Sequence, residues 1–238
     1  MKIRANSMIP KPEARECFEK GRKLCEIKQY SDAISLFNDT LTNQSNYFNA
    51  WNYKGFALYK LKKYYEALKC FEKAIEIKPN YLNAWINKGK ALYRLGKFEQ
   101  SIECFNYLTT LKPESDIAWK YKGLAFKNVG SLKNALECFE QSIKIKENYA
   151  QLWKKKADKF LNEGQAELAK ECLQIVKKTL GCNCNPLIQI SEILCETGKI
   201  QNAIDCIEIA IRLKPENDKL ISKKEAILKK YSNEVENE

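Results

Sequence analysis

Residues 48–81 read FNAWNYKGFALYKLKKYYEALKCFEKAIEIKPNY, and this stretch decides the fold because its pattern returns along the chain. The four tryptophans of the 238-residue sequence stand 34 residues apart, at Trp51, Trp85, Trp119 and Trp153. Glycine recurs four and eleven residues after this position, cysteine nineteen residues after it and phenylalanine twenty. A fixed period of this length indicates one helical hairpin that is copied along the chain.

The period phases the chain into units of constant length, without insertion or deletion. We expect six of them: 14–47, 48–81, 82–115, 116–149, 150–183 and 184–217. Residues 1–13 contain two prolines and no helical pattern, so we expect an extended arm there. Residues 218–238 are expected to form a capping helix, up to Tyr231, and an acidic tail, because the last unit of a stack needs a polar outer face.

The unit 48–81 carries the signature residues of a known repeat: Trp51, Gly55, Leu58, Ala67, Phe71, Ala74 and Pro79. In these residues the chain resembles the tetratricopeptide repeat family. The resemblance covers residues 14–217. It implies an all-α fold, a right-handed superhelical α-solenoid of stacked antiparallel helix pairs.

Glycine and proline have positions that physical chemistry explains. Eight of the nine glycines occupy slot eight or slot fifteen of a unit. A glycine at slot eight permits close approach of the paired helix, and one at slot fifteen ends the first helix in a left-handed conformation. Pro79, Pro113 and Pro215 all occupy slot thirty-two, where proline ends the second helix because it lacks an N–H group.

Composition and cysteine usage predict a cytoplasmic protein. Residues 1–13 do not resemble a secretory signal, and no apolar run approaches the length of a membrane span. Half of the ten cysteines form a ladder at slot twenty-three: Cys70, Cys104, Cys138, Cys172 and Cys206. Neighbouring ladder positions would lie too far apart for disulfides, so we interpret these thiols as small core side chains in a reducing compartment.

Cys182 and Cys184 form the one pair that invites a different interpretation. With Cys195 and Cys206 they could supply four thiolates to zinc, or the pair could form a labile disulfide. A zinc ribbon shows two paired-cysteine motifs, and this chain has one C-x-C. We therefore expect neither a metal nor any other cofactor, and the redox role of the pair stays open.

Catalysis has little support in the sequence. The chain has no histidine, the commonest general acid–base at neutral pH, and its glycines are explained by the repeat geometry. We therefore expect a binding protein rather than an enzyme, with no catalytic residues.

The resemblance also implies a binding site, because first helices of successive repeats line a concave groove. Their slots two, five, six, nine, twelve and thirteen face the ligand in the family. Carried over to this chain, these slots predict a peptide-binding set: Asn52, Tyr53, Phe56, Tyr59, Asn87, Lys90, Tyr93, Arg94, Lys120, Tyr121 and Lys127. In unit five the same slots give Gln151, Lys154, Lys155, Asp158, Leu161 and Asn162.

The chemistry of these residues indicates the kind of partner. Asparagine amides can pair with an extended peptide backbone, and lysine and arginine attract carboxylates. The four middle units together account for the whole net charge of +11. We therefore expect a protein-interaction scaffold that binds an extended, acidic peptide segment. The pattern specifies neither the partner's identity nor an oligomeric state, and it gives no reason to expect a membrane partner.

The groove residues do not fit one known mode of peptide binding, and they leave an alternative function open. The clamp with which some family members hold acidic chaperone C-termini needs five residues at defined slots. When the clamp starts at unit two, only Asn87 matches, and no other starting unit completes the set. The alternative function is RNA or nucleic-acid binding, with lysines on phosphates and tyrosines stacked on bases.

A lysine replaces the family's leucine at slot seven in the first five units: Lys20, Lys54, Lys88, Lys122 and Lys156. We expect the stems of these lysines to lie on apolar surface while the ammonium groups reach water. The alternative interpretation is a ladder of positive charge along the solenoid.

Overall fold

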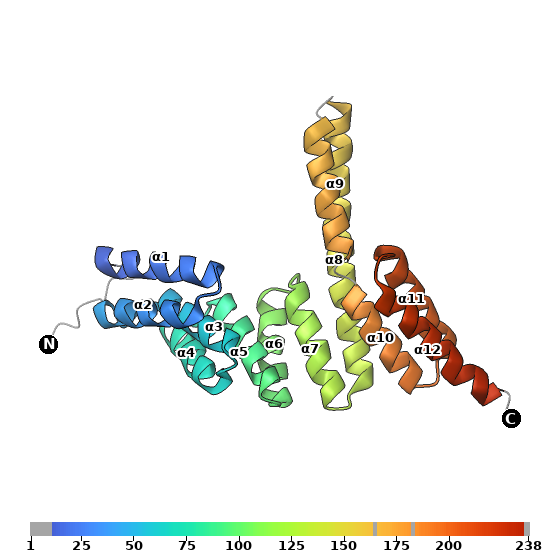
Figure 1. Ribbon diagram of the computed structural model, residues 1–238, viewed down its shortest axis with the longest axis horizontal. Helices are drawn as coiled ribbons and strands as arrows, with labels where there is room; N and C mark the ends of the chain where they lie inside the picture. The colour runs from blue at the N-terminus through green and yellow to red at the C-terminus, as the bar shows by residue number, and fades with distance from the viewer. Residues whose placement is uncertain (1–10, 164–165, 182–183, 236–238) are drawn as a thin grey trace. The chain divides into compact units, whose positions relative to one another are not determined.

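The computed structural model describes residues 11–163, 166–181 and 184–235, and every regular element within these residues is an α-helix (Figure 1). The chain divides into two compact units, Met1–Pro113 and Glu114–Glu238, called the N-unit and the C-unit below. The all-α fold of stacked helix pairs that the sequence predicts is confirmed.

The N-unit contains three helix pairs, each of which coincides with one 34-residue repeat. Its helices are α1 (Pro12–Glu26), α2 (Tyr30–Asn43), α3 (Phe48–Lys60), α4 (Tyr64–Ile77), α5 (Leu82–Arg94) and α6 (Phe98–Leu111). Each helix packs against the next one along the chain. The first helix begins at Pro12, so the predicted arm is shorter by two residues, and residues 1–10 lie outside the described part.

One contact between glycine and phenylalanine repeats in every regular pair. A Cβ atom added to Gly55 would lie 2.6 Å from the ring of Phe71, which is fully buried. The pairs Gly21–Phe37, Gly89–Phe105 and Gly123–Phe139 show the same approach at 2.7–2.8 Å. The missing side chain at slot eight therefore makes room for the aromatic ring of the partner helix, as the sequence predicts.

The turns inside the helix pairs follow the prediction for slot fifteen. Gly96, Gly130 and Gly198 have φ angles of +74° to +77°, the left-handed region in which glycine is not strained. Lys28 and Lys62 occupy the same slot in the first two repeats and adopt the same conformation, with φ of 65° and 62°. These two lysines keep the turn despite their Cβ atoms.

The slot-seven lysines lie over the tryptophans of their own helices. The Nζ atoms of Lys54, Lys88, Lys122 and Lys156 are 4.6–5.6 Å from the ring centroids of Trp51, Trp85, Trp119 and Trp153, respectively. In the N-unit, the indole N–H groups of the first two tryptophans donate to backbone carbonyls of the preceding turn. Each lysine therefore makes a cation–π contact with an indole ring. The apolar surface on which we expected the lysine to lie is thus the tryptophan of the same helix.

The described ladder cysteines pack as predicted. Cys70, Cys104 and Cys138 are buried free thiols, and burial raises the pKa of each to about 11. Cys206 is half-buried, and the side chain of Cys172 lies outside the described part. Because a thiol with so high a pKa stays protonated at neutral pH, these cysteines behave as small apolar side chains.

The C-unit departs from the regular arrangement. Its helices are α7 (Asp116–Asn128), α8 (Leu132–Asn162), α9 (Ala166–Gly181), α10 (Cys184–Glu196), α11 (Ile200–Leu213) and α12 (Asp218–Val235). The boundary that the period places between residues 149 and 150 lies inside α8, a single helix of 31 residues. Slot thirty-two holds Glu147 in this unit, and a glutamate permits the helix to continue where a proline ends it.

Because α8 is continuous, the fifth repeat does not pack between the fourth and sixth repeats of the C-unit. Helices α8 and α9 form a long hairpin that extends away from the other helices of the C-unit (Figure 1). Helix α10 packs against the first half of α8 instead, where Ile190 and Ile193 join Phe139 and Ala135 in one core cluster. The structure therefore stacks the sixth repeat directly on the fourth.

The capping helix covers the end of the last repeat in part. On α12, Leu220 packs with Cys184, Leu187 and Ala210, while Ile227 packs with α11. Ile221 and Leu228, which belong to the same predicted stripe, are 40% and 45% exposed. The helix continues to Val235, four residues beyond the predicted end.

No described helix combines the length and apolar character that a membrane crossing needs. No cluster of three or more histidine, cysteine, aspartate or glutamate side chains in the described residues is placed to hold a metal ion. The Cys184 thiol points at the Ala210 carbonyl oxygen at 3.6 Å, whereas Cys182 lies outside the described residues.

Candidate functional site

The first helices of the N-unit repeats bring two predicted binding residues together. Asn52 on α3 is buried to 5% exposure, and Asn87 on α5 is half-buried. The Asn87 Nδ2 atom donates to Asn52 Oδ1 at 3.0 Å, and Asn52 Nδ2 lies 3.5 Å from the Tyr81 hydroxyl. The two amides thus form a hydrogen-bonded row from one repeat to the next.

A second link of the same spacing joins two further predicted residues. The Arg94 Nε atom on α5 donates to the Tyr59 hydroxyl on α3 at 3.3 Å. Both links join residues 35 positions apart, so they run between successive repeats along one face. We call this face the inner face of the N-unit; it also carries Tyr53, Phe56, Lys90 and Tyr93.

Aromatic packing holds this inner face in place. Tyr53 packs edge-on against Phe18, with ring centroids 5.3 Å apart, and Phe56 packs against Tyr30 at 6.4 Å. Tyr93 packs against Phe98 at 5.5 Å. These predicted binding residues therefore also pack within the unit.

Burial also affects the tyrosine that supports the amide row. It raises the pKa of Tyr81, and this effect outweighs the hydrogen bonds from Asn83 and Asn52 that lower it. The hydroxyl therefore stays protonated at neutral pH and can serve as both donor and acceptor. Slot carry-over missed Tyr81 because it is the last residue of its repeat, outside the first helix.

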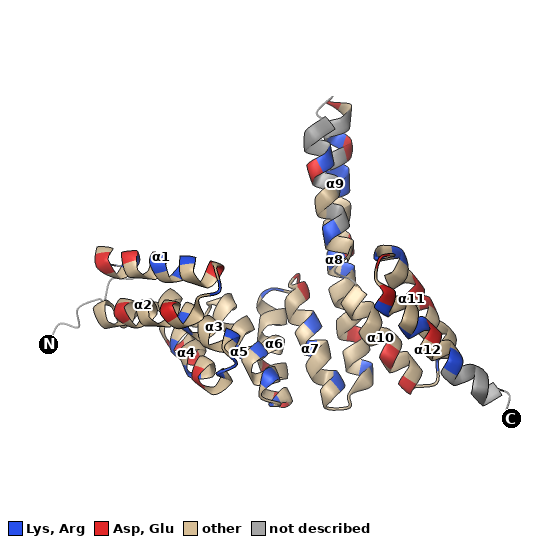
Figure 2. Ribbon diagram, viewed as in Figure 1, with Lys and Arg blue, Asp and Glu red and all other residues tan. Residues whose placement is uncertain are grey.

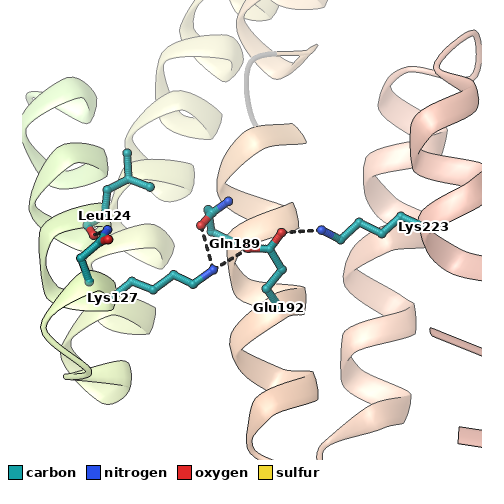
Figure 3. A network of polar contacts seen from close by, with 6 residues as sticks. Leu124, Lys127, Gln189, Glu192 and Lys223 are labelled. Atoms are coloured by element: carbon teal, nitrogen blue, oxygen red, sulfur yellow. Dashed lines mark hydrogen bonds and ion pairs between the residues drawn. The ribbon is translucent and has the colours of Figure 1, made fainter. Parts of the chain in front are cut away.

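In the C-unit the predicted residues lie on α7. The Lys120 ammonium lies over the Tyr121 ring, 5.1 Å from its centroid. Lys127 Nζ donates to Gln189 Oε1 at 3.2 Å and to Glu192 Oε2 at 2.5 Å, and the Lys223 ammonium donates to the other carboxylate oxygen (Figure 3). Three helices, α7, α10 and α12, meet at this one carboxylate.

The two lysines lower the pKa of that carboxylate. Burial raises the pKa of Glu192, but the hydrogen bonds and charges of Lys127 and Lys223 outweigh burial, and the pKa lies below its ordinary value of 4.5. Glu192 is therefore ionised at neutral pH and balances much of the charge of both lysines. Lys127, predicted as a binding residue, has an internal anion as its partner.

Sequence reasoning missed Gln189, Glu192 and Lys223, although the signal was present. Gln189 and Glu192 occupy slots six and nine of the sixth repeat, and Lys223 occupies slot six of the cap when the period is continued. The prediction extended the groove slots through unit five. In the structure α10 takes the place beside α7, and the unit-five residues lie on the projecting part of α8 and its tip.

Comparisons with known proteins bear on the repeat architecture. Three family models, each described as tetratricopeptide repeat, match residues 48–81, 70–103 and 122–149. No curated protein sequence matches the chain.

Solved structures similar to this chain include three of the same architecture. One is YrrB, described as a TPR protein with an unusual peptide-binding site; it is 16% identical over 89% of this chain and 92% of its own, with a TM-score of 0.63. A thermophilic TPR protein from Thermus thermophilus is 15% identical over 90% and 98% of the two chains, with a TM-score of 0.59. MamA from Desulfovibrio magneticus RS-1 is 16% identical over 72% and 97%, with a TM-score of 0.56. At these identities the likeness concerns the fold.

Proposed function

We propose that this chain, which belongs to the tetratricopeptide repeat family, is a protein-interaction scaffold that binds an extended, acidic peptide segment on the inner face of the N-unit. The observation that carries the proposal is the hydrogen-bonded row of Asn52 and Asn87, with the Tyr59–Arg94 link beside it. A continuous row of amides, tyrosines and cations across successive repeats suits a ligand that runs along the stack.

The chemistry of this face favours a peptide backbone. The Asn87 Nδ2 group donates to Asn52, and no hydrogen bond within the described residues reaches the Asn87 side-chain oxygen. A peptide N–H group is a suitable donor to this oxygen, and the neighbouring tyrosine rings offer apolar area with polar tips. The preference for an acidic segment rests on Lys90 and Arg94, which lie on the same helix as Asn87.

Lys120, Tyr121 and Lys127, which are also predicted binding residues, form a second proposed patch on α7 of the C-unit. The pairing of Lys127 with Glu192 makes this patch less cationic than the sequence predicts. We therefore assign the main contribution to the N-unit residues.

A cytoplasmic location is part of the proposal. The eight cysteines with described side chains are all free, including four with pKa values raised to about 11 by burial. Unpaired thiols are the usual state in a reducing compartment.

A peptide selection tests the proposal directly. The chain is used to select binders from a random-peptide display library, and the enriched peptides are measured by fluorescence anisotropy. We expect acidic sequences whose affinity falls about five- to tenfold with Asn87→Ala, since one backbone hydrogen bond contributes about 1 kcal/mol. The double variant Lys90→Glu/Arg94→Glu should weaken binding more at low salt than at high salt, because screening reduces steering.

The matched control places the same charge change on another helix. Lys69→Glu/Lys73→Glu alters two lysines of α4, the second helix of the neighbouring second repeat, and should leave affinity nearly unchanged. Equal losses in both double variants would contradict binding on the inner face. Binding from lysate that disappears after nuclease treatment would favour the alternative, recognition of RNA.

A further inference from the structure

The fourth and sixth repeats of the C-unit pack on each other without the outer part of the α8–α9 hairpin. Residues of the fourth and sixth repeats contact each other directly, through Phe139 with Ile190 and Ile193 and through Lys127 with Glu192. Helix α9 packs chiefly against α8, and the hairpin extends beyond the remaining helices of the unit (Figure 1). The described residues 149–163 and 166–181 therefore form a two-helix arm that extends beyond the other helices of the C-unit (Figure 1).

The outer side of the α8 part of this arm combines one large apolar side chain with lysines. Leu152 is 66% exposed, and Tyr149 at the foot of the arm is 47% exposed. Lys155 and Lys159 follow Leu152 at spacings of three and seven residues, which place all three on the same face of the helix. Ala150, on the opposite side, is buried. We call Tyr149, Leu152, Lys155 and Lys159 the arm face.

The charges of the arm face are only lightly balanced. Lys155 has no ion pair within the described residues, and the Lys159 side chain is 73% exposed with a loose contact of 3.7 Å to Glu163. Lysines recur along both helices of the arm (Figure 2), and residues 150–183 carry a net charge of +3. On one helix face, Leu152 and Tyr149 thus offer apolar contact area beside the positive charges of Lys155 and Lys159, which suits an anionic, partly apolar partner.

We propose that the arm face docks an acidic amphipathic helix of a partner protein. An apolar residue of that helix would cover Leu152 and Tyr149, and its carboxylates would pair with Lys155 and Lys159. The side of a helix offers neither an open sheet edge nor a deep groove, so a second helix that packs along it is the ligand whose shape fits.

Charge complementarity selects this occupant over a second copy of the chain. Two arms packed face to face would bring like charges together, which opposes association. This docking surface is separate from the inner face of the N-unit, so the two proposals can fail independently.

The test uses the full chain and a synthetic probe. The probe is a fluorescent amphipathic peptide of about 20 residues, with leucines at helical spacing and glutamates at the other positions. We expect saturable binding in fluorescence anisotropy, and a loss of about tenfold in affinity for Lys155→Gln/Lys159→Gln and for Leu152→Asp. The glutamine double variant keeps helix propensity, so circular dichroism should not change.

Matched variants and probes separate the proposal from general charge attraction. Lys133→Gln/Lys144→Gln removes two lysines from the first half of α8 and should retain the affinity. A peptide in which serines replace the leucines should bind at least several-fold more weakly. Asn87→Ala, which tests the inner face, should have no effect on this probe.

Three results would overturn the proposal. One is no measurable binding of the acidic probe, and another is equal loss in the two lysine pairs. The third is tighter binding, dependent on Lys155 and Lys159, of a uridine 20-mer or of vesicles containing phosphatidylserine, which would assign the arm face to RNA or to a membrane surface instead.

Discussion

The junction between the second and third repeats and the junction between the fourth and fifth carry the same sequence period and have different structures. At the first, α4 ends at Ile77, Lys78 leaves the helical region with φ of −135°, and Pro79 follows. At the second, Lys146 and Glu147 continue α8 without interruption. The period therefore specifies where hairpins form, while a few residues between repeats decide whether a hairpin stacks or projects.

The first prediction tests whether the residue at position 147 causes this difference. Glu147→Pro removes a backbone donor and introduces a ring clash inside α8, which costs about 3 kcal/mol or more if the helix stays continuous. We expect α8 to end before residue 147 and the arm to change its direction. Hydrogen exchange should show lost protection at residues 147–151, and small-angle X-ray scattering should report a changed radius of gyration.

The control for this variant is Glu147→Ala, which keeps a strong helix former at the same position. It should preserve both protection and scattering. A proline variant with unchanged exchange at residues 147–151 would contradict the continuous helix.

The second prediction concerns the glycine–phenylalanine contact, which the N-unit and the C-unit share. Gly55→Ala and Gly123→Ala each place a Cβ atom 2.6–2.8 Å from a buried phenylalanine ring, and each should destabilise its unit by about 2 kcal/mol. Similar losses in the free energy of unfolding, measured in urea by circular dichroism, would show that the core of the helix pair is the same in the N-unit and the C-unit.

Gly96→Ala provides the contrast for these two variants. A Cβ atom there meets nothing within 4 Å, so only the positive φ of 74° opposes it. Its cost should be about 1 kcal/mol. A larger effect at Gly96 than at Gly55 would mean that the ring contact does not limit the glycine positions.

The sequence predicts the helix pairs well because their determinants are local and repeated. Glycine at slot eight faces phenylalanine, glycine at slot fifteen takes a positive φ, and Pro79 follows the end of α4, as predicted. The departure at Glu147 is weakly encoded, because the α2–α3 junction also lacks a proline and still ends the helix. Glutamate at residue 147 permits α8 to continue, but whether it continues depends on which repeat packs on α8. That packing is a tertiary interaction, which the local sequence does not specify.

The candidate site was predictable to a similar degree. Slot carry-over brings Asn52 close to Asn87 and Tyr59 close to Arg94, because the period fixes which positions of successive helices face each other. It did not foresee that Lys127 pairs with Glu192, since the two residues belong to repeats that meet only when the fifth repeat projects. Whether these residues bind a peptide stays a prediction.

The third prediction tests the ion pairs of Glu192, which join the fourth repeat, the sixth repeat and the capping helix. Glu192→Gln removes the anion between Lys127 and Lys223, and near neutral pH it should destabilise the C-unit by about 1–2 kcal/mol. Because the folded-state pKa of Glu192 lies below its unfolded value near 4.5, the contribution is present above that pH. It is lost as the pH falls through the lowered pKa.

Unfolding of wild type and variant over a range of pH measures this contribution. The two curves should converge in acid, and the difference near neutrality should shrink at high salt. Glu163→Gln serves as the control, because its pair with Lys159 is exposed and should contribute little. A difference that is the same in acid and at neutral pH would rule out an ionic origin.

The smallest expected effect comes from the turn of the second repeat. Lys62 takes the slot that glycine fills in later repeats and has a φ of 62°, so its Cβ atom is strained in the folded state. Lys62→Gly relieves this strain, and part of the gain is offset because glycine is more flexible in the unfolded chain. We expect a net stabilisation of about 0.5–1 kcal/mol in urea unfolding. Lys63→Gly, one residue later at a φ of −82°, relieves no strain and should instead destabilise. If both variants shift stability in the same direction, the left-handed turn does not limit the stability of the regular repeats.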